Sequence, residues 1–447
     1  MAQGLPFPMP RTSSAPGAGR LASGSPRLVP PHYVIPVSRL GAVREGIRAR
    51  TSLPREVLVL GLIAFCVAVG FGVLVPVLPV FARSFDVGNF EVGAVISAFA
   101  LMRLLSSPLC GRMIERWSER VVMATGIFIV AVSSGLAGIS QSYEQLLVLR
   151  GVGGVGSAMF TVSAFTLLLT SVEAGLRGRA AGFFQSGFLI GGMAGPAVGA
   201  LLSAISLTAP FFFYAGTLAV AGTVGLVLLR AREPRPDQVN AVAVRFADAL
   251  RDPRYQAALL TNLAQGWTAF GVRSSLVPVL VVEVLQRPAS WTGIAFAVAA
   301  VAQTIALGPA GRFVDTVGRR PAMIGGGLAA GLTMMAVPFA PNIWVLITVL
   351  CAYGVASAFL GTAPAAAVGD ATGGVRSGRA VAAFSMCSDL GAIVGPLVAG
   401  LLADTVSYPA AFAVGAALTV LGAGWSIRMP RETPPAERRA SEPASTE

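Results

Sequence analysis

The sequence has no lysine, a single histidine (His32) and few charges of either sign: charged residues make up 12% of 447, and apolar residues 54%. So little charge cannot cover the surface of a soluble protein of this length, which predicts that lipid surrounds most of the chain. His32 precedes the first long apolar stretch, so the carboxylates are left to carry protons within a membrane. Four cysteines are scattered without metal-ligand spacing, and we interpret them as small buried apolar residues: Cys66, Cys110, Cys351 and Cys387.

The sequence also lacks a glycine-rich phosphate loop, a nucleophile paired with a base, and a cluster of metal ligands. These absences argue against ATP-driven transport, against a membrane enzyme and against a bound metal. We therefore expect a protein that is not an enzyme and that needs no cofactor.

Long apolar stretches are what the sequence has instead of charge. A transmembrane helix needs about 20 consecutive apolar residues, and this rule predicts an all-α membrane protein with twelve spans. The predicted spans are 57–82, 90–110, 121–140, 145–170, 179–203, 209–230, 256–283, 290–310, 321–340, 343–369, 379–403 and 409–428.

The spans divide into two bundles of six, with polar segments around them. We expect bundles over residues 54–230 and 256–428, joined by a cytoplasmic linker at 231–255 in which 239–250 forms a short helix on the membrane surface. The segments 1–53 and 429–447 are rich in small, polar and charged residues, and we expect both to be disordered cytoplasmic tails.

The net charge of +12 comes from arginines that lie almost entirely in alternate loops and in the tails. The loops on the opposite side of the membrane contain only two arginines, Arg83 and Arg287. This asymmetry follows the positive-inside rule, which predicts a multi-pass protein of the cell membrane with both termini in the cytoplasm. The charge therefore sets orientation in the lipid bilayer, and we expect no nucleic-acid partner and a monomer.

An internal repeat is the most informative pattern in the sequence. Residues recur at a constant shift of 200 over some ninety positions, without gaps: Gly111, Gly154, Gly178 and Gly195-Pro196 match Gly311, Gly354, Gly378 and Gly395-Pro396. Each half holds an even number of spans, so both halves enter the membrane from the same side. Such parallel repeats are related by an axis along the membrane normal, and they place a binding site near the midplane between the halves.

Two further motifs accompany the repeat. The loops after the second and eighth spans contain Gly111, Arg112, Glu115, Arg116 and Arg120, and Gly311, Arg312, Asp315, Gly318, Arg319 and Arg320. The fifth span contains Gly182, Gly187, Gly191, Gly195, Pro196 and Gly199, and the eleventh a shorter version with Gly391, Gly395, Pro396 and Gly400. The four fifth-span glycines from Gly187 to Gly199 are spaced by four and share one helix face. Such a face allows backbones to touch in lipid, and Pro196 favours a bend.

These patterns resemble the major facilitator superfamily, and the fifth span resembles that of its twelve-helix drug:proton antiporters. The resemblance covers nearly the whole chain apart from the tails, and it implies two pseudo-symmetric six-helix bundles. It also implies that the loop motif clasps helix ends when the cytoplasmic side is closed, and that the glycine face forms a bent hinge between the halves. The alternatives are that the loop arginines only fix topology and that the glycines only pack helices. The loop after the second span departs from the family pattern at Glu115, Ser118 and Glu119, so we expect it to hold the neighbouring helix ends less strongly.

Four ionisable residues lie within the predicted spans, where each costs about 2.5–3.5 kcal/mol on insertion scales. Asp389 is the first candidate for proton coupling; it could instead be a structural carboxylate. Arg273 could bind an anionic group or hold Asp389 in an ion pair. Arg103 has a polar counterpart, Gln303, in the repeat. Arg150 begins an Arg-x-x-x-Gly element that resembles a superfamily pattern for proton coupling; alternatively, it reaches the membrane interface.

Other polar residues within the spans are candidates to line the cavity, although such residues often only bond to neighbouring helices: Gln185, Asn262, Gln265, Trp267 and Gln303. The spans hold more arginine than carboxylate, so neutral, zwitterionic or anionic solutes suit the cavity better than polycations.

The leading hypothesis is a secondary active transporter that exports small, largely apolar compounds by proton antiport with alternating access. Such compounds include drugs, as in multidrug resistance, toxins or a secreted metabolite. The proton gradient supplies the energy, about 2.3 kcal/mol per charge at 100 mV. The alternative is proton-coupled or facilitated uptake of a sugar-like or organic-acid nutrient, which would dispense with the fifth-span glycines.

Overall fold

In the part of the chain that the computed structural model describes, twelve helices are long and apolar enough to cross a membrane. The structure describes residues 54–172, 177–229, 246–371 and 378–430, which belong to one compact unit, Leu53–Glu447. Every regular element among these residues is helical, so the predicted fold class is confirmed. The tails expected to be disordered, 1–53 and 429–447, lie outside the described residues, apart from 429 and 430.

Among its described residues, the first half has seven helices: α2 Arg55–Leu74, α3 Leu78–Arg83, α4 Asn89–Trp117, α5 Glu119–Ala137, α6 Tyr143–Thr170, α7 Arg177–Ile205 and α8 Ala209–Leu228. In the second half, a short helix precedes a span made of four consecutive segments: α9 Phe246–Arg251, α10 Pro253–Gln265, η2 Gly266–Arg273, α11 Ser274–Val279 and η3 Leu280–Val284. It continues with α12 Ser290–Thr316, α13 Arg319–Ala336, η4 Val337–Phe339, α14 Ile343–Ala371, α15 Gly378–Thr405, α16 Tyr408–Trp425 and η5 Ser426–Arg428.

Two spans differ from the predicted continuous helices. The stretch predicted as 57–82 is broken between α2 and α3, because Pro76 lacks the N–H that would continue the helix. The seventh span is π-helical over η2 and η3. In η2, Gly266 and Gly271 pack directly against the backbone of Ser388 and Gly395 in α15, and such local widening is frequent at functional sites.

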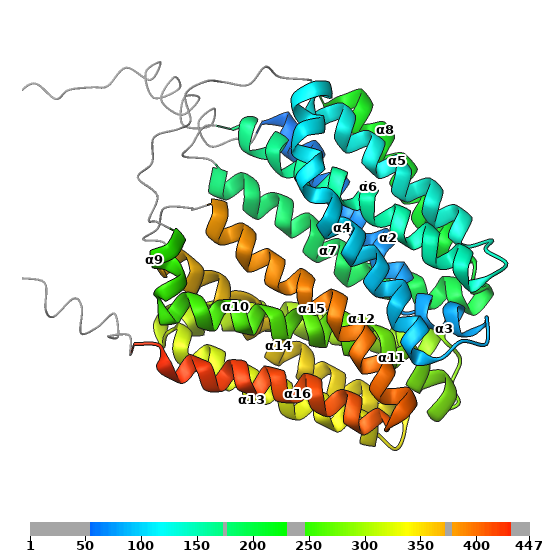
Figure 1. Ribbon diagram of the computed structural model, residues 1–447, viewed down its shortest axis with the longest axis vertical. Helices are drawn as coiled ribbons and strands as arrows, with labels where there is room; N and C mark the ends of the chain where they lie inside the picture. Colours follow the sequence, from blue (N-terminus) through cyan, green and yellow to red (C-terminus); the bar gives the residue numbers. More distant parts are fainter. Residues whose placement is uncertain (1–53, 173–176, 230–245, 372–377, 431–447) are drawn as a thin grey trace, which may run out of the picture. The chain divides into compact units, whose positions relative to one another are not determined.

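The sequence repeat reappears as equivalent contacts between the halves. Gly93 of α4 lies against the carbonyl of Pro396 in α15, and Gly293 of α12 lies against the carbonyl of Pro196 in α7. Both partners of the first contact are related to those of the second by the shift of 200. The interfaces α4–α15 and α7–α12 are therefore pseudo-symmetric, and Figure 1 shows α7, α12 and α15 running where the two halves meet.

The glycine face of α7 packs inside the first half rather than between the halves. A Cβ atom added to Gly191 would lie 2.5 Å from the carbonyl oxygen of Phe65, and one added to Gly199 would lie 2.6 Å from that of Val73. Both partners belong to α2, so these glycines bring the α2 and α7 backbones into contact. The glycine face thus forms a close-packed α2–α7 pair instead of lying between the halves as expected, and the carbonyl of Pro196 faces the other half.

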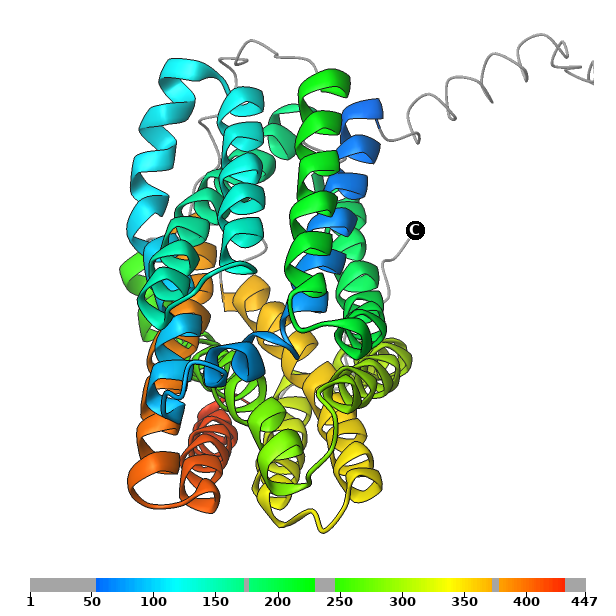
Figure 2. The ribbon, with the colours of Figure 1, turned by 90° about the vertical axis from the view of Figure 1, so that its right-hand side faces the viewer.

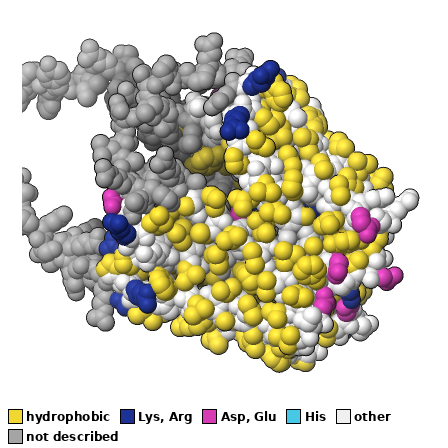
Figure 3. All heavy atoms as spheres, in the orientation of Figure 1, with side chains coloured by type: hydrophobic (Ala, Val, Ile, Leu, Met, Phe, Trp, Pro, Cys, Tyr) yellow, Lys and Arg dark blue, Asp and Glu magenta, His cyan; other side chains and the backbone are white. Residues whose placement is uncertain are grey.

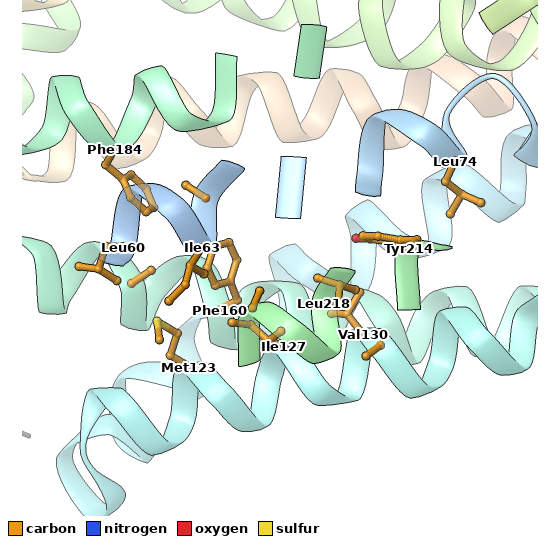
Figure 4. Close-up of a cluster of buried hydrophobic side chains, with 14 of the residues drawn as sticks. Leu60, Ile63, Leu74, Met123, Ile127, Val130, Phe160, Phe184, Tyr214 and Leu218 are labelled. Atoms are coloured by element: carbon orange, nitrogen blue, oxygen red, sulfur yellow. The ribbon is translucent and has the colours of Figure 1, made fainter. Parts of the chain in front are cut away.

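Apolar side chains fill the interior of each half, as they do in soluble proteins. In the first half, Leu60 and Ile63 of α2 meet Met123 of α5 and Phe160 of α6, all at most 4% exposed (Figure 4). On the face shown in Figure 3, hydrophobic side chains also cover the outside, with most of the basic side chains toward one end and most of the carboxylates toward the other. This outer apolar belt is what contact with lipid requires.

We call the end at which α2 begins and α16 finishes the terminal end, and the opposite end the far end. α3 lies at the far end, where it contacts α11 of the other half; Figure 2 is viewed from that end. The short helix expected at 239–250 is present only as α9, and residues 230–245 lie outside the described part.

Ser118, at the α4–α5 junction, adopts a backbone conformation that suits glycine. It has φ 74° and ψ 151°, and its repeat counterpart Gly318 has φ 121° and ψ 163°. A non-glycine residue in this region costs about 1–3 kcal/mol, whereas glycine loses about 0.5–1 kcal/mol more entropy on folding.

We expect Ser118→Gly to raise the free energy of unfolding by about 1 kcal/mol, measured by thermal unfolding in detergent. Gly318→Ser is the reverse control, and a lower melting temperature for Ser118→Gly would contradict the strain.

Candidate functional site

A cavity of about 530 Å³ lies between the two halves. Its walls come from α2, α4, α6, α7 and α8 of the first half and from η2, α11, α12 and α15 of the second. Six phenylalanines contribute to the lining: Phe71, Phe99, Phe160, Phe188, Phe270 and Phe296. Concave, mainly apolar cavities with a few placed polar groups are typical of small-molecule sites.

The charged residues that line the cavity are all arginines. Arg103 reaches it from α4, Arg150 from α6 and Arg273 from η2, while none of the described residues that line it is a carboxylate. The candidates Gln185 and Gln303 also line it. The cavity is thus apolar for the most part and carries positive charge from both halves.

Arg150 is buried and incompletely hydrogen-bonded. It is 4% exposed, its guanidinium lies 4.4 Å from the ring centroid of Phe99, and its Nε and Nη1 atoms have no hydrogen-bond partner. This contact is a cation–π interaction, which stabilises the charge without using the N–H donors. Arg150 lies about 10 Å along α6 from the far end, at the α-helical rise.

Arg273 has similar surroundings in the second half. Its guanidinium lies 5.2 Å from the ring centroid of Phe296 and 5.8 Å from that of Tyr353. Its Nε atom is buried and has no hydrogen-bond partner. Both arginines therefore lie on aromatic faces and keep unused donors beside the cavity.

Asp389 forms an ion pair with Arg103 that joins α15 to α4. The sequence suggests Arg273 as a partner for this carboxylate, but the two residues lie at different distances from the terminal end along their helices, too far apart to pair. At the α-helical rise, Asp389 and Arg103 lie about 16 and 21 Å from the terminal end, whereas Arg273 lies about 30 Å away. The side chains of Arg103 and Asp389 are 33% and 23% exposed, so solvent reaches this pair.

The polar contacts between the halves extend from the far end to this ion pair. Arg83 lies 2.6 Å from Glu283, and Ser97 donates to the carbonyl of Ile393 at 2.6 Å. Within the described residues, the part of α4 beyond Arg103 makes no hydrogen bond or ion pair with the second half. The contacts therefore close the far end, and the two halves separate toward the terminal end (Figure 1).

Asp404 is a cross-half residue that the sequence analysis missed. Its carboxylate accepts hydrogen bonds from the backbone N–H groups of Asn89 and Phe90, at 3.0 and 2.8 Å, and from the Asn89 side chain at 2.7 Å. These N–H groups begin α4, whose N-cap residue is Gly88 and supplies no side-chain cap. A helix whose N-cap residue is glycine needs a hydrogen-bond acceptor from elsewhere in the protein for its first N–H groups. This need was the only sign in the sequence that a carboxylate would pack against the start of α4.

Three of the predicted cavity residues are used in packing within the second half. Asn262 donates to the carbonyl of Phe384 at 2.6 Å, and Gln265 donates to Ser357 at 2.7 Å. Trp267 is 9% exposed and belongs to the apolar core. None of the three is among the lining residues, because this face of α10 and η2 packs on α14 and α15.

The loop motif lies at the terminal end, away from the cavity. Arg120 donates to the carbonyl of Leu226, and Arg319 pairs with Asp370 at 3.0 Å. Both contacts stay within one half, in agreement with separated halves at this end. A Cβ atom added to Gly111 or Gly311 would meet nothing within 4 Å. The Glu115 side chain is outside the described part.

Comparisons with known proteins agree with this architecture. A family model described as Major Facilitator Superfamily matches residues 60–302 and 264–446. The chain is 26% identical to Multidrug resistance protein 1 of Bacillus subtilis (strain 168) over 374 residues, covering 80% of this chain and 93% of the relative. It is 24% identical to the Synaptic vesicular amine transporter of Bos taurus over 326 residues, 72% of this chain and 62% of that protein.

The fold resembles that of solved transporters. The crystal structure of a mutant of the nucleoside transporter NupG superposes with a TM-score of 0.67 at 15% identity, covering 83% of this chain and 99% of that one. At this identity the likeness concerns the fold. Since the family model matches most of the sequence and the twelve spans match it in architecture, the chain belongs to the Major Facilitator Superfamily and is a multi-pass membrane transporter, not an enzyme.

Proposed function

We propose that this transporter exports small, largely apolar compounds in exchange for protons. The observation that carries the proposal is the phenylalanine-lined cavity between the halves. Aromatic and aliphatic walls favour apolar cargo by about 25 cal/mol per Å² of apolar surface buried. Three hydroxyls of the lining, those of Thr161, Ser274 and Thr304, already donate to backbone carbonyls of their own membrane spans. Apart from the arginines and the two glutamines, few groups remain to replace the water around a sugar, which disfavours uptake of such a nutrient.

The proposed orientation places the terminal end in the cytoplasm of the cell. The support is the concentration of arginine in the tails and in the loops of that end, as the positive-inside rule requires. In this orientation the structure is an inward-facing state, closed at the far end and ready to take up cargo from the cytoplasm. Rocking of the halves about the cavity then exposes the cargo to the other side.

The proposed proton site is Asp389 together with Arg103. The ion pair requires the charged carboxylate, so a proton that binds Asp389 breaks a contact between α4 and α15. In the inward-facing state, re-formation of the pair expels the proton toward the cytoplasm. Proton binding is thereby coupled to the relative position of the halves, and the energy source is the proton gradient.

Proteoliposomes with an imposed pH gradient test this proposal. Addition of apolar candidate cargoes should release protons from vesicles containing the wild type, and Asp389→Asn should reduce this release to background while cargo binding persists. Arg103→Gln, chosen to match the repeat counterpart Gln303, removes the ion pair but keeps the titratable carboxylate. Comparison of the two variants therefore separates loss of the carboxylate from loss of the ion pair. Absence of proton flux with every cargo would refute antiport. Normal flux in Asp389→Asn would remove only Asp389 from the mechanism.

A further inference from the structure

Two arginines of the cavity wall, the buried Arg150 and the half-buried Arg273, lack carboxylate partners within the described residues. Arg103 is neutralised by Asp389, but the structure shows no acidic contact for Arg150 or Arg273. Burying a charge without a partner is costly, particularly in a membrane. The aromatic faces under both guanidinium groups offset part of this cost and leave N–H donors unused.

These arginines are not shared features of the duplicated scaffold. The repeat counterpart of Arg150 is Leu350, and that of Arg273 is Val73. Each half therefore has an arginine at a position where the other half has an apolar residue. A purely structural need of the fold would be met by the apolar residue, so a need specific to the cavity explains the arginines better.

The two arginines also share a location. Arg150 lies about 10 Å from the far end along α6, and Arg273 lies about 16 Å from it along the seventh span, at the α-helical rise. The polar contacts of Arg83, Asp404 and Ser97 close that end. Both arginines thus enter the cavity nearer its closed end than Arg103 does, one from each half.

We infer that the cavity binds an amphipathic organic acid, whose carboxylate or sulfonate is held by Arg150 and Arg273 at the closed end. Its apolar body then lies among the phenylalanines. Guanidinium donors form charge-assisted hydrogen bonds with such groups, which are about twice as strong as neutral ones. This inference rests on the proposed function and narrows it from apolar compounds to apolar compounds with an acid group. Bound in this way, the cargo contacts both halves at once.

Equilibrium binding of three probes with the same phenylpropenyl body tests the charge preference. The probes are cinnamate, its neutral amide cinnamamide and the cationic cinnamylamine, added to the purified full chain in phosphatidylcholine nanodiscs. Tritiated cinnamate and competition by the other two give the affinities. Loss of charge-assisted hydrogen bonds predicts that cinnamate binds about 10- to 100-fold more tightly than the amide. The cation is expected to bind most weakly.

Variants of the two arginines assign the preference to them. Arg150→Gln and Arg273→Gln should each reduce the preference for cinnamate over cinnamamide by at least about tenfold, with little change in amide affinity. Arg287→Gln, an exposed arginine of the far end, is the matched control. Without ligand, the two glutamine variants should melt at the same temperature as the wild type or higher, because an uncompensated buried charge is removed. If these arginines instead stabilised the fold, their replacement by glutamine would lower the melting temperature.

The outcomes separate this inference from the proposed function. If the amide binds as tightly as cinnamate, or the cation binds best, the organic-acid inference fails and export of apolar compounds stands. If none of the three probes binds, the organic-acid inference fails, and the proton-release assay with other apolar cargoes decides the proposed function separately. A preference for cinnamate that survives in both glutamine variants would also overturn the assignment.

Discussion

A Gly191→Val variant is expected to yield little folded protein. A Cβ atom at this position would lie 2.5 Å from the Phe65 carbonyl oxygen, 2.8 Å from the Ala68 Cβ and 2.9 Å from the Val69 nitrogen. Two of these atoms belong to the α2 backbone, so a side-chain rotation cannot relieve the clash. Overpacking costs about 1–3 kcal/mol and occasionally more, and we expect the upper part of this range or beyond. Size-exclusion profiles and thermal unfolding in detergent measure the loss.

The fifth span also supplies the control for this variant. Gly182 belongs to the same motif and the same helix, but a Cβ atom added there meets nothing within 4 Å. We expect Gly182→Val to behave nearly as the wild type. Equal stability of the two variants would show that the α2–α7 contact is looser than these distances imply.

An Asp404→Ala variant is expected to shift the protein toward states that are open at the far end. The carboxylate accepts three hydrogen bonds from Asn89 and Phe90 across the halves, and two of them cap the N-terminus of α4. Hydrogen bonds to a charged group contribute about 1.5–3 kcal/mol each, and favourable charge at a helix N-terminus adds to this. Loss of even one such bond changes the ratio of the two states roughly 10- to 100-fold.

Distances between the halves measure this shift. Spin labels at Gln141→Cys and Pro341→Cys, made after the native cysteines are replaced, report on exposed turns of the far end that correspond under the repeat. Asp404→Ala should move the distribution toward longer distances. Asp86→Asn, which neutralises an exposed carboxylate of the same end, should leave it unchanged. An unaltered distribution in Asp404→Ala would mean that other contacts keep the far end closed.

The fold could be predicted from the sequence because it rests on local and repeated information. Apolar stretches define spans one at a time, and the shift of 200 relates the halves without any knowledge of contacts. The departures have local causes: Pro76 breaks the first span, and Gly266 and Gly271 allow the seventh to widen against α15. The partner of the glycine face could not be predicted, because four spaced glycines fit any neighbouring backbone.

The site was only partly predictable, because it depends on which helices face each other and at what height. All four ionisable candidates lie in or beside the cavity, since the cost of burying charge singles them out. The pairing of Asp389 with Arg103 required the relative heights of α4 and α15. The phenylalanine lining was missed because Phe99 or Phe296 in an apolar span looks the same whether it faces lipid, core or cavity.

The ion pair between Arg83 and Glu283 connects two positions that the repeat makes equivalent. Equivalent residues of a two-fold arrangement touch only on the axis itself, so this pair marks where the axis leaves the far end. Two identical copies of one half would bring arginine against arginine or glutamate against glutamate there. The duplicated halves thus have to differ in charge at this point to close together, which makes the first half a partner for the second but not for itself.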